Sequence, residues 1–167
     1  IKQRLNSQED LIALSHFNAN IDNAWFWQTE QGALECGLFD WQRARRMNLA
    51  YAMWGGLCAA GPSIWNDELD SLLTEFVDEY HAAGGPKVQA ADLREQLHLY
   101  SAYMGVAGLL GAARLVRERV ADVHLAAGPT DPIILANEGA RCFLHVFTAF
   151  LNFLEMDNFS TRLPAQF

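Results

Sequence analysis

The spacing of apolar residues changes after Asp40, and the change predicts a small β element followed by helices. Before that point, residues 24–27 and 34–39 form two short apolar runs around a turn at residues 30–32, which is typical of a β-hairpin. Further on, apolar residues recur three and four positions apart, which is the period of an amphipathic helix. The sequence therefore predicts a mainly α domain with one small β-hairpin.

Glycine, proline and capping residues mark the expected helix boundaries. In chain order they are Gly61 with Pro62 as a stop, Asn66 as an N-cap, residues 84–86 as a second stop, and Asp131 with Pro132 as the start of the last helix. Residues 92–120 predict one long helix or two, because the glycines between residues 104 and 111 allow either close packing or a break.

The length of the chain suits one domain. Its 167 residues are 51% hydrophobic and 19% charged, so the chain can bury a core, and this composition excludes wholesale disorder. We expect a single helical domain, in which residues 1–44 form a loop with the hairpin and residues 45–167 form the helical body. No uninterrupted apolar run reaches the roughly 18 residues that a membrane span needs, so no membrane partner is expected.

Charge and cysteine usage narrow the function classes. Twelve Lys and Arg against twenty Asp and Glu give a net charge of −8, so the chain gains little from phosphate contacts and we expect no nucleic-acid partner. Cys36, Cys58 and Cys142 lie far apart and form no CxxC pair, so neither a disulfide framework nor a zinc site is expected. A reducing, cytoplasmic location follows as the default expectation.

One loop carries the residues with chemical potential. His16 and Asn18 are followed by Asn23, then by the two hairpin strands, and then by Asp40 within a Leu-Phe-Asp-Trp segment. This order resembles the aminoglycoside phosphotransferase/choline kinase-like family, whose His-Gly-Asp-(four residues)-Asn loop precedes an apolar strand, a turn and an Ile-Asp-Trp or Ile-Asp-Phe segment. Residues 72–81 are similar to the Leu-Leu…Tyr-His helix of that family. The resemblance implies the helical C-terminal lobe of a protein-kinase-like fold.

The resemblance also implies ATP- and Mg²⁺-dependent phosphoryl transfer to a hydroxyl of a small molecule, and the acidic balance favours a cationic one. Asp40 and Asn23 would then hold Mg²⁺ against the nucleotide phosphates, since Mg²⁺ prefers hard oxygen ligands. Asn18 stands where the family has the Asp that accepts or orients the substrate hydroxyl. His16 would be structural and would bond backbone near the metal-binding Asp.

The chain departs from the family pattern in three ways. Asn18 has no titratable group, and loss of a positioned base typically costs about 10²–10⁴-fold in rate. Asp22 is a substitute base only from outside the motif, and Phe17 replaces a glycine. Only 15 residues precede His16, too few for a nucleotide-binding β-lobe, so we expect that this chain alone does not hold ATP and Mg²⁺ in the kinase manner. Either the N-terminal lobe lies upstream of this chain, or the chain works without one.

Two alternatives stay open beside the enzyme. A catalytically inactive kinase-like binding or scaffold module fits the change at Asn18. In an unrelated helical protein, Asn18 and Asn23 would be ordinary turn formers and Asp40 a plain helix cap, and the absence of a hairpin would decide for this reading.

Exposed aromatic side chains would favour a homo-oligomer. The arginines at positions 43, 45 and 46 fit either a phosphate contact or a solvated helix start.

Overall fold

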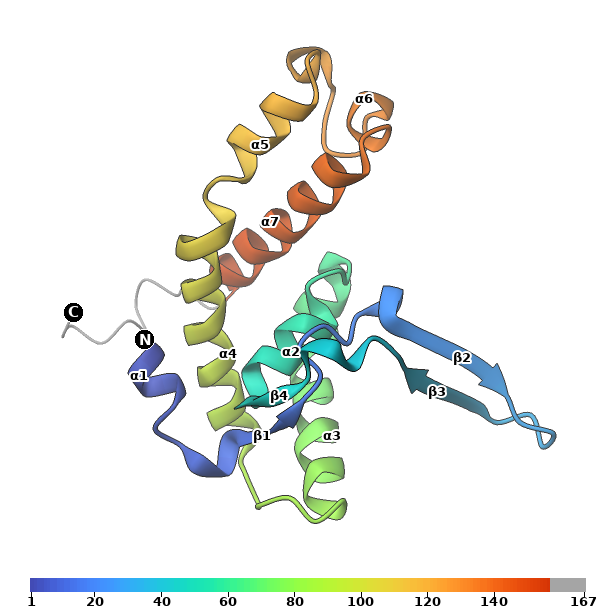
Figure 1. The fold of residues 1–167 in the computed structure, drawn as a ribbon, viewed down its shortest axis with the longest axis vertical. Coiled ribbons are helices and arrows are strands. Elements are labelled where there is room, and N and C mark those ends of the chain that lie inside the picture. The colour runs from blue at the N-terminus through green and yellow to red at the C-terminus, as the bar shows by residue number, and fades with distance from the viewer. Residues whose placement is uncertain (157–167) are drawn as a thin grey trace. The chain divides into compact units, whose positions relative to one another are not determined.

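A computed structural model describes residues 1–156, and the chain divides into two compact units (Figure 1). The first unit is Ile1–Cys58 with Glu68–Tyr100, and the second is Ala59–Asp67 with the chain from Ser101 on. The described chain is mainly helical with two small antiparallel sheets, which confirms the predicted combination of helices and a hairpin.

The first unit combines both sheets with three longer helices. In chain order it contains α1 (Lys2–Leu5), a 3₁₀ turn (Glu9–Leu11), β1 (Ile12–Ser15), a 3₁₀ turn (Ile21–Asn23), β2 (Ala24–Gln28), β3 (Leu34–Leu38), a 3₁₀ turn (Trp41–Arg43), β4 (Arg45–Asn48), α2 (Leu49–Leu57), α3 (Leu69–Ala82) and most of α4 (Ala90–Met104). Its buried apolar residues include Leu49, Met53 and Trp54 of α2, Leu69, Leu73 and Val77 of α3, and Leu93 and Leu97 of α4.

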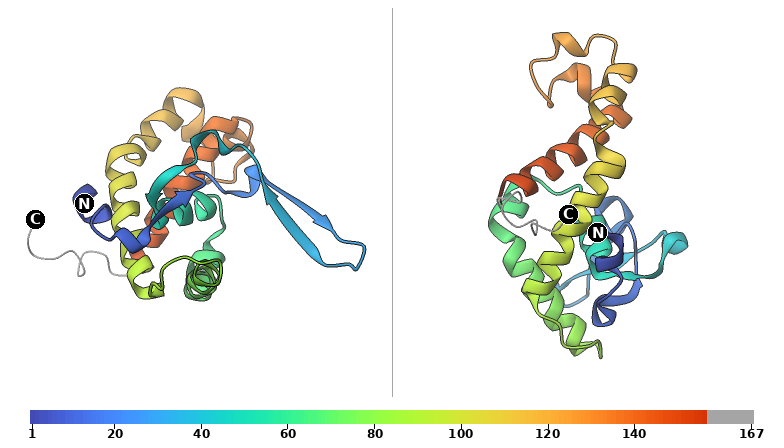
Figure 2. Two further views of the ribbon diagram at one scale, coloured as in Figure 1. Left: turned by 60° about the horizontal axis from the view of Figure 1, so that its bottom comes forward. Right: turned by 90° about the vertical axis from the view of Figure 1, so that its left-hand side faces the viewer.

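Strands β2 and β3 form the predicted hairpin. Their antiparallel register pairs Ala24 with Leu38 and Gln28 with Leu34, and the two strands lie side by side in every view (Figure 2). Gly32 turns the chain with a φ of 82°, which favours glycine. The strand ends at Leu38, one residue earlier than expected. The hairpin is therefore present. Its absence would have decided for an unrelated helical protein.

The sequence did not predict the second sheet. Strands β1 and β4 pair from Ile12 with Asn48 to Ser15 with Arg45. The helical pattern was expected to begin directly after Asp40, but a 3₁₀ turn and β4 come first. Helix α2 then begins at Leu49, where the Asn48 side chain accepts a hydrogen bond from the backbone N–H of Ala50. The four-residue strands are too short for an alternating pattern to reveal them.

The two boundaries of α3 gave opposite outcomes. The predicted stop is confirmed, because Gly84 takes a φ of 94° and its N–H donates to the carbonyl oxygen of His81. The predicted N-cap at Asn66 is wrong. A π turn covers Ile64–Glu68, and the Asn66 side-chain oxygen accepts a hydrogen bond from Asn152 at 2.8 Å instead.

The second unit is a set of helices joined by short turns. It contains the π turn Gly105–Leu109, α5 (Ala112–Arg119), a 3₁₀ turn (Val123–Leu125), α6 (Pro132–Leu135) and α7 (Glu138–Met156), and α5 lies beside α7 (Figures 1 and 2). The glycine-rich stretch gives both expected effects. It breaks the helix into α4 and α5, and a Cβ on Gly105 would lie 2.0 Å from the Phe150 ring.

Asp131 is a helix cap, as predicted, but of a different helix. Its side chain accepts a hydrogen bond from the N–H of Ile133, and Pro132 occupies the first turn of α6. Helix α7 starts separately, where the Asn137 side chain accepts from the N–H of Ala140 at 2.9 Å. The expected single last helix is therefore two helices.

One helical stretch of the described chain, Ala90–Arg119, has the length and composition to cross a membrane. Of the 18 consecutive residues that make up its most apolar part, 44% are buried within the structure. We expected no membrane span because no uninterrupted apolar run is long enough. This stretch was not recognised because polar residues and glycines interrupt it. Core helices of folded domains meet the same criterion, so the stretch by itself assigns no membrane location.

Candidate functional site

His16 ties the polar loop after β1 to the end of the hairpin. Its Nε2–H donates to the carbonyl oxygen of Phe39 at 2.8 Å, and its Nδ1 accepts from the backbone N–H of Asn18 at 3.2 Å. Because a carbonyl only accepts and an amide N–H only donates, these partners assign the proton to Nε2 of a neutral imidazole. The expected structural role of His16 is confirmed.

The loop itself is held by bonds among its Asn side chains. The Asn23 amide nitrogen donates to the carbonyl oxygen of Asn18 at 2.8 Å, and the Asn20 amide nitrogen donates to the Asn18 side-chain oxygen at 3.0 Å. The Asn20 side-chain oxygen accepts from the N–H of Asp22. These residues therefore do form turns, as one alternative expected, and the turns also fix where Asn18 and Asn23 lie.

Asp40 occupies a left-handed corner immediately after the hairpin. Its φ of 60° is the only positive φ at a non-glycine residue in the described chain, a conformation that costs roughly 1–2 kcal/mol. Asp40 precedes the 3₁₀ turn Trp41–Arg43, but its side chain makes no capping hydrogen bond. Asp40 therefore does not cap this turn through its side chain. Strained backbone at a polar residue is a feature of functional sites.

Trp41 braces this corner against the loop. Its indole N–H donates to the carbonyl oxygen of Leu38 at 2.8 Å, and its ring meets the His16 ring edge to face, with 4.7 Å between the ring centroids. The backbone before and after Asp40 is thus fixed by two aromatic side chains, and this bracing supports the left-handed conformation.

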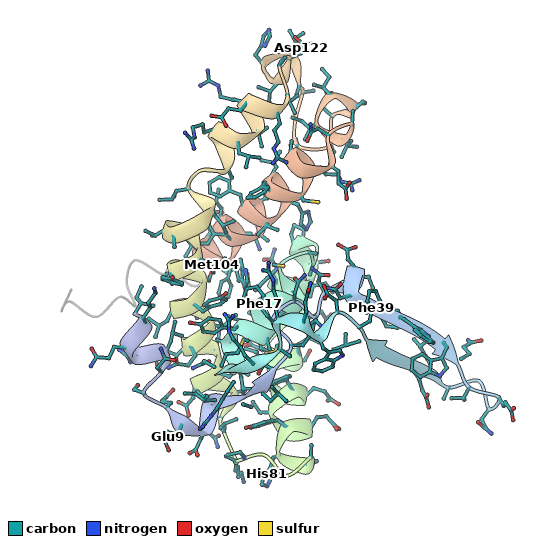
Figure 3. All side chains as sticks on the ribbon, viewed as in Figure 1. Glu9, Phe17, Phe39, His81, Met104 and Asp122 are labelled. Atoms are coloured by element: carbon teal, nitrogen blue, oxygen red, sulfur yellow. The ribbon has the colours of Figure 1, made fainter. Side chains whose placement is uncertain are left out.

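The base of the hairpin brings Asn23 next to the residue before Asp40. The N–H of Phe39 donates to the carbonyl oxygen of Asn23 at 3.1 Å, which continues the β2–β3 pairing by one step. Figure 3 shows Phe39 at this base, where β3 leaves the hairpin. Asn23 and Asp40 therefore emerge from the same end of the hairpin. Within residues 1–156, the Asn23 side-chain oxygen and the Asp40 carboxylate accept no hydrogen bond.

A cavity of about 450 Å³ lies over the loop and the corner. Its lining residues are His16, Phe17, Asn18, Asp40, Gln42 and Arg43. Asp40 and Arg43 face the same cavity but form no ion pair in the described chain, so it offers one anionic and one cationic group. Neither Asn23 nor the exposed Asp22 is among the lining residues, so the lining contains two of the three predicted site residues, Asn18 and Asp40.

The arginines after Asp40 take three different positions. Arg43 lines the cavity, Arg45 lies with its guanidinium carbon 5.7 Å from the centroid of the Phe17 ring, and Arg46 is exposed on β4. A guanidinium above an aromatic face is attracted to it. Phe17 therefore holds one arginine beside the loop.

Gly55 of α2 lies directly against the loop backbone. The sequence did not predict that this position matters for the site. A Cβ at this position would lie 2.1 Å from the carbonyl oxygen of Phe17. Only a glycine therefore lets the helix approach the loop backbone this closely. The signal in the sequence was a Gly-Gly pair within a helix, where each glycine costs roughly 1 kcal/mol relative to alanine.

The tryptophans divide between core and surface. Trp54 and Trp65 are buried, whereas Trp25 is 63% exposed and Trp41 52% exposed. The exposed ones lie on or beside the hairpin, together with Phe26, so the aromatic side chains of β2 remain uncovered in this chain. They lie outside the lining of the cavity.

The oxygen groups at the corner are of the kind that hard cations such as Mg²⁺, Ca²⁺ and Mn²⁺ accept. The described residues contain no group of three His, Cys, Asp or Glu side chains that could enclose a metal. One carboxylate and one amide oxygen are hard ligands, and Mg²⁺ is usually bound by few protein groups with phosphates and water completing its shell. Two such oxygens do not make a closed protein cage, so a cation held by them would need further ligands from water or a bound molecule.

Comparison of the chain with protein-family models, curated proteins and solved structures finds no match in any of the three. No family is established by similarity, and the resemblance to aminoglycoside phosphotransferase/choline kinase-like proteins stays a prediction from its motif. The function has to be proposed from the chemistry of the site.

Proposed function

We propose that this protein is a phosphotransferase-like protein that binds ATP with Mg²⁺ and transfers the terminal phosphoryl group to a hydroxyl of a small molecule. One observation carries the proposal: the Asp40 carboxylate has no hydrogen-bond partner among the described residues, although the backbone around it is firmly held. A carboxylate that faces a cavity, on a strained backbone held in place by neighbouring side chains, is suited to bind a cation.

Each residue of the site then has a defined role. Asp40 and Asn23 would hold Mg²⁺, which supplies positive charge to the nucleotide phosphates when bound. Arg43 contributes a second positive charge to the same cavity. His16 is a positioning residue, because it fixes Phe39 and Asn18 and does not itself offer a free nitrogen to substrate.

The reaction forms a bond between the acceptor hydroxyl oxygen and the γ-phosphorus. The bond from that phosphorus to the bridging oxygen breaks, and ADP leaves with the electron pair. The hydroxyl proton passes to an oxygen of the transferred phosphoryl group, because Asn18 can orient the hydroxyl but cannot accept its proton. A loose transition state makes only a modest demand for a base at this step.

A second candidate function is a catalytically inactive kinase-like binding module. It is favoured by Asn18, whose side-chain oxygen is already engaged by the Asn20 amide. It is also favoured by the single arginine in the lining, because ATP carries several negative charges. Such a module would hold a ligand at the corner without turnover.

Titration calorimetry of the full-length protein with ATP, in the presence and absence of Mg²⁺, tests the proposal. We expect Mg²⁺-dependent binding that is lost in Asp40→Asn and kept in Asp22→Asn, since Asp22 is an exposed carboxylate outside the cavity lining. Failure of both the native chain and Asn18→Asp to bind nucleotide would overturn phosphotransfer. Binding without turnover, restored to turnover in Asn18→Asp, would favour the inactive module.

A further inference from the structure

A second cavity, of about 270 Å³, lies beside α7 within the second unit. Its lining residues are Ala60, Pro62, Pro129, Thr130, Leu135, Arg141, Leu144, His145, Thr148 and Ala149. Most of this surface is apolar, and no lining residue is acidic. A mainly apolar cavity with a few polar groups on one side is the usual form of a small-molecule site.

The two cationic or potentially cationic groups lie one turn apart on α7. Arg141 and His145 are four positions apart, so they share one face of the helix. The His145 Nε2–H donates to the carbonyl oxygen of Ala59 at 3.0 Å. This bond fixes the ring. Nδ1 can then donate to a carboxylate only when the imidazole carries a proton on both nitrogens.

The Arg141 guanidinium has no ion pair among residues 1–156. The chain carries a net charge of −8, so acidic side chains are plentiful, yet none is placed against this arginine. A guanidinium binds both oxygens of a carboxylate with parallel hydrogen bonds. The cavity therefore combines an unused anion-binding group with apolar walls.

We propose that this cavity binds a small amphipathic monocarboxylate, with Arg141 and His145 on its carboxylate and the apolar walls around an aromatic ring or short alkyl chain. The volume suits one ring or a short chain and is too small for a long lipid tail. A phosphate ester fits less well, because burying a second negative charge against apolar walls is costly. The site shares no lining residue with the cavity at Asp40 and does not depend on the proposed phosphotransfer.

The neighbouring cavity provides a matched control. It has a volume of about 330 Å³, and its lining includes Arg117, Val116, Ile134 and Phe147. It has an arginine and apolar walls but no second polar group like His145. The variant Arg117→Gln therefore makes the same charge change in the same unit without touching the proposed site.

The test is a fluorine NMR titration of the full chain with 4-fluorophenylacetate and with its neutral amide, 4-fluorophenylacetamide. We expect the acid to bind and the amide to bind at least about tenfold more weakly, because the charge-assisted hydrogen bonds are lost. Arg141→Gln should weaken binding of the acid by about tenfold or more, and Arg117→Gln by less than about twofold. Thr130→Phe, which fills the cavity from an exposed loop position, should abolish binding while Arg141 remains.

Circular dichroism melting curves show whether each variant folds. If Arg141→Gln unfolds, Arg141→Lys keeps the charge without the planar fork and should still weaken binding of the acid. No binding of the acid, equal binding of acid and amide, or equal loss in the Arg141 and Arg117 variants would each overturn the proposal.

Discussion

His16 and Phe39 lie 23 positions apart in the sequence and are joined by a hydrogen bond of 2.8 Å from the imidazole Nε2–H to the carbonyl oxygen. Phe39 directly precedes the left-handed Asp40, and the other His16 nitrogen holds the backbone of Asn18. One buried ring thus sets the positions of both the loop and the corner. The geometry of the candidate site follows from this bond more than from any contact between the site residues themselves.

Replacing His16 with Phe should keep the ring against Trp41 but leave the Phe39 carbonyl and the Asn18 N–H without their partner. Because His16 is buried, we expect a loss of about 1–3 kcal/mol in the free energy of unfolding, measured by urea denaturation. The exposed His124 gives the control variant His124→Phe, which should be neutral. Equal stability of the His16 variant and the native chain would contradict the positioning role.

Two adjacent glycines of α2 test how the loop is supported. Gly55→Ala places a Cβ 2.1 Å from the Phe17 carbonyl oxygen, so the loop or the helix must shift, and we expect a loss of about 1–3 kcal/mol with weaker nucleotide binding. In Gly56→Ala the nearest atom, the Ala19 carbonyl oxygen, is 3.5 Å away, and higher helix propensity should stabilise by up to about 1 kcal/mol. Chemical denaturation of both variants would separate them, and effects of the same sign would be inconsistent with this packing.

Asn18→Asp restores a proton acceptor at the position where the loop lacks one. The Asn20 amide can still donate to the new carboxylate, so the loop should keep its shape. We expect phosphoryl transfer or ATP hydrolysis to rise by about 10²-fold or more, measured by a coupled ADP assay. Asn66→Asp makes the same change in the π turn and should have no effect on turnover. An unchanged rate in Asn18→Asp would contradict the assignment of position 18 to the missing proton acceptor.

Asp131 makes the stability of the second unit depend on acid pH. Backbone N–H groups of Ala127 and then Ile133 donate to its carboxylate, and these bonds lower the pKa of Asp131 below its ordinary value of 3.8. The charged Asp131 carboxylate therefore stabilises the folded state fully above that value. This stabilisation is lost as the pH falls through the lower pKa that the group has in the folded state. We expect Asp131→Asn to flatten the fall in melting temperature below pH ~4, whereas Asp122→Asn, whose side chain caps nothing, should leave the curve unchanged.

Local chemistry made part of this structure predictable. The hairpin follows from two apolar runs around a Gly turn, the end of α3 from Gly84, and the start of α6 from Asp131 and Pro132, because each signal acts within a few residues. The Asn-rich loop and Asp40 were chosen as a candidate site because their order along the chain resembles that of a known motif, and this resemblance stays a prediction.

The remainder depends on contacts between distant residues. The pairing of β1 with β4 joins strands of four residues each, which carry too little pattern to be read alone. The left-handed conformation of Asp40 needs the His16 and Trp41 bonds, and the requirement for Gly55 appears only when Phe17 is seen against α2. The two units also could not be inferred, because a composition that suits one core does not reveal how the chain divides.

The most direct test of the proposed metal site uses Mn²⁺ in place of Mg²⁺, with ATP, and follows the broadening of NMR signals by the paramagnetic ion. We predict that the side-chain amide of Asn23 and the backbone amide of Asp40 broaden first and together, and that Asp40→Asn abolishes both effects. Broadening that starts instead at the acidic residues Glu9 and Asp10, or that reaches Asp40 and leaves Asn23 sharp, would contradict a shared ion at the base of the hairpin.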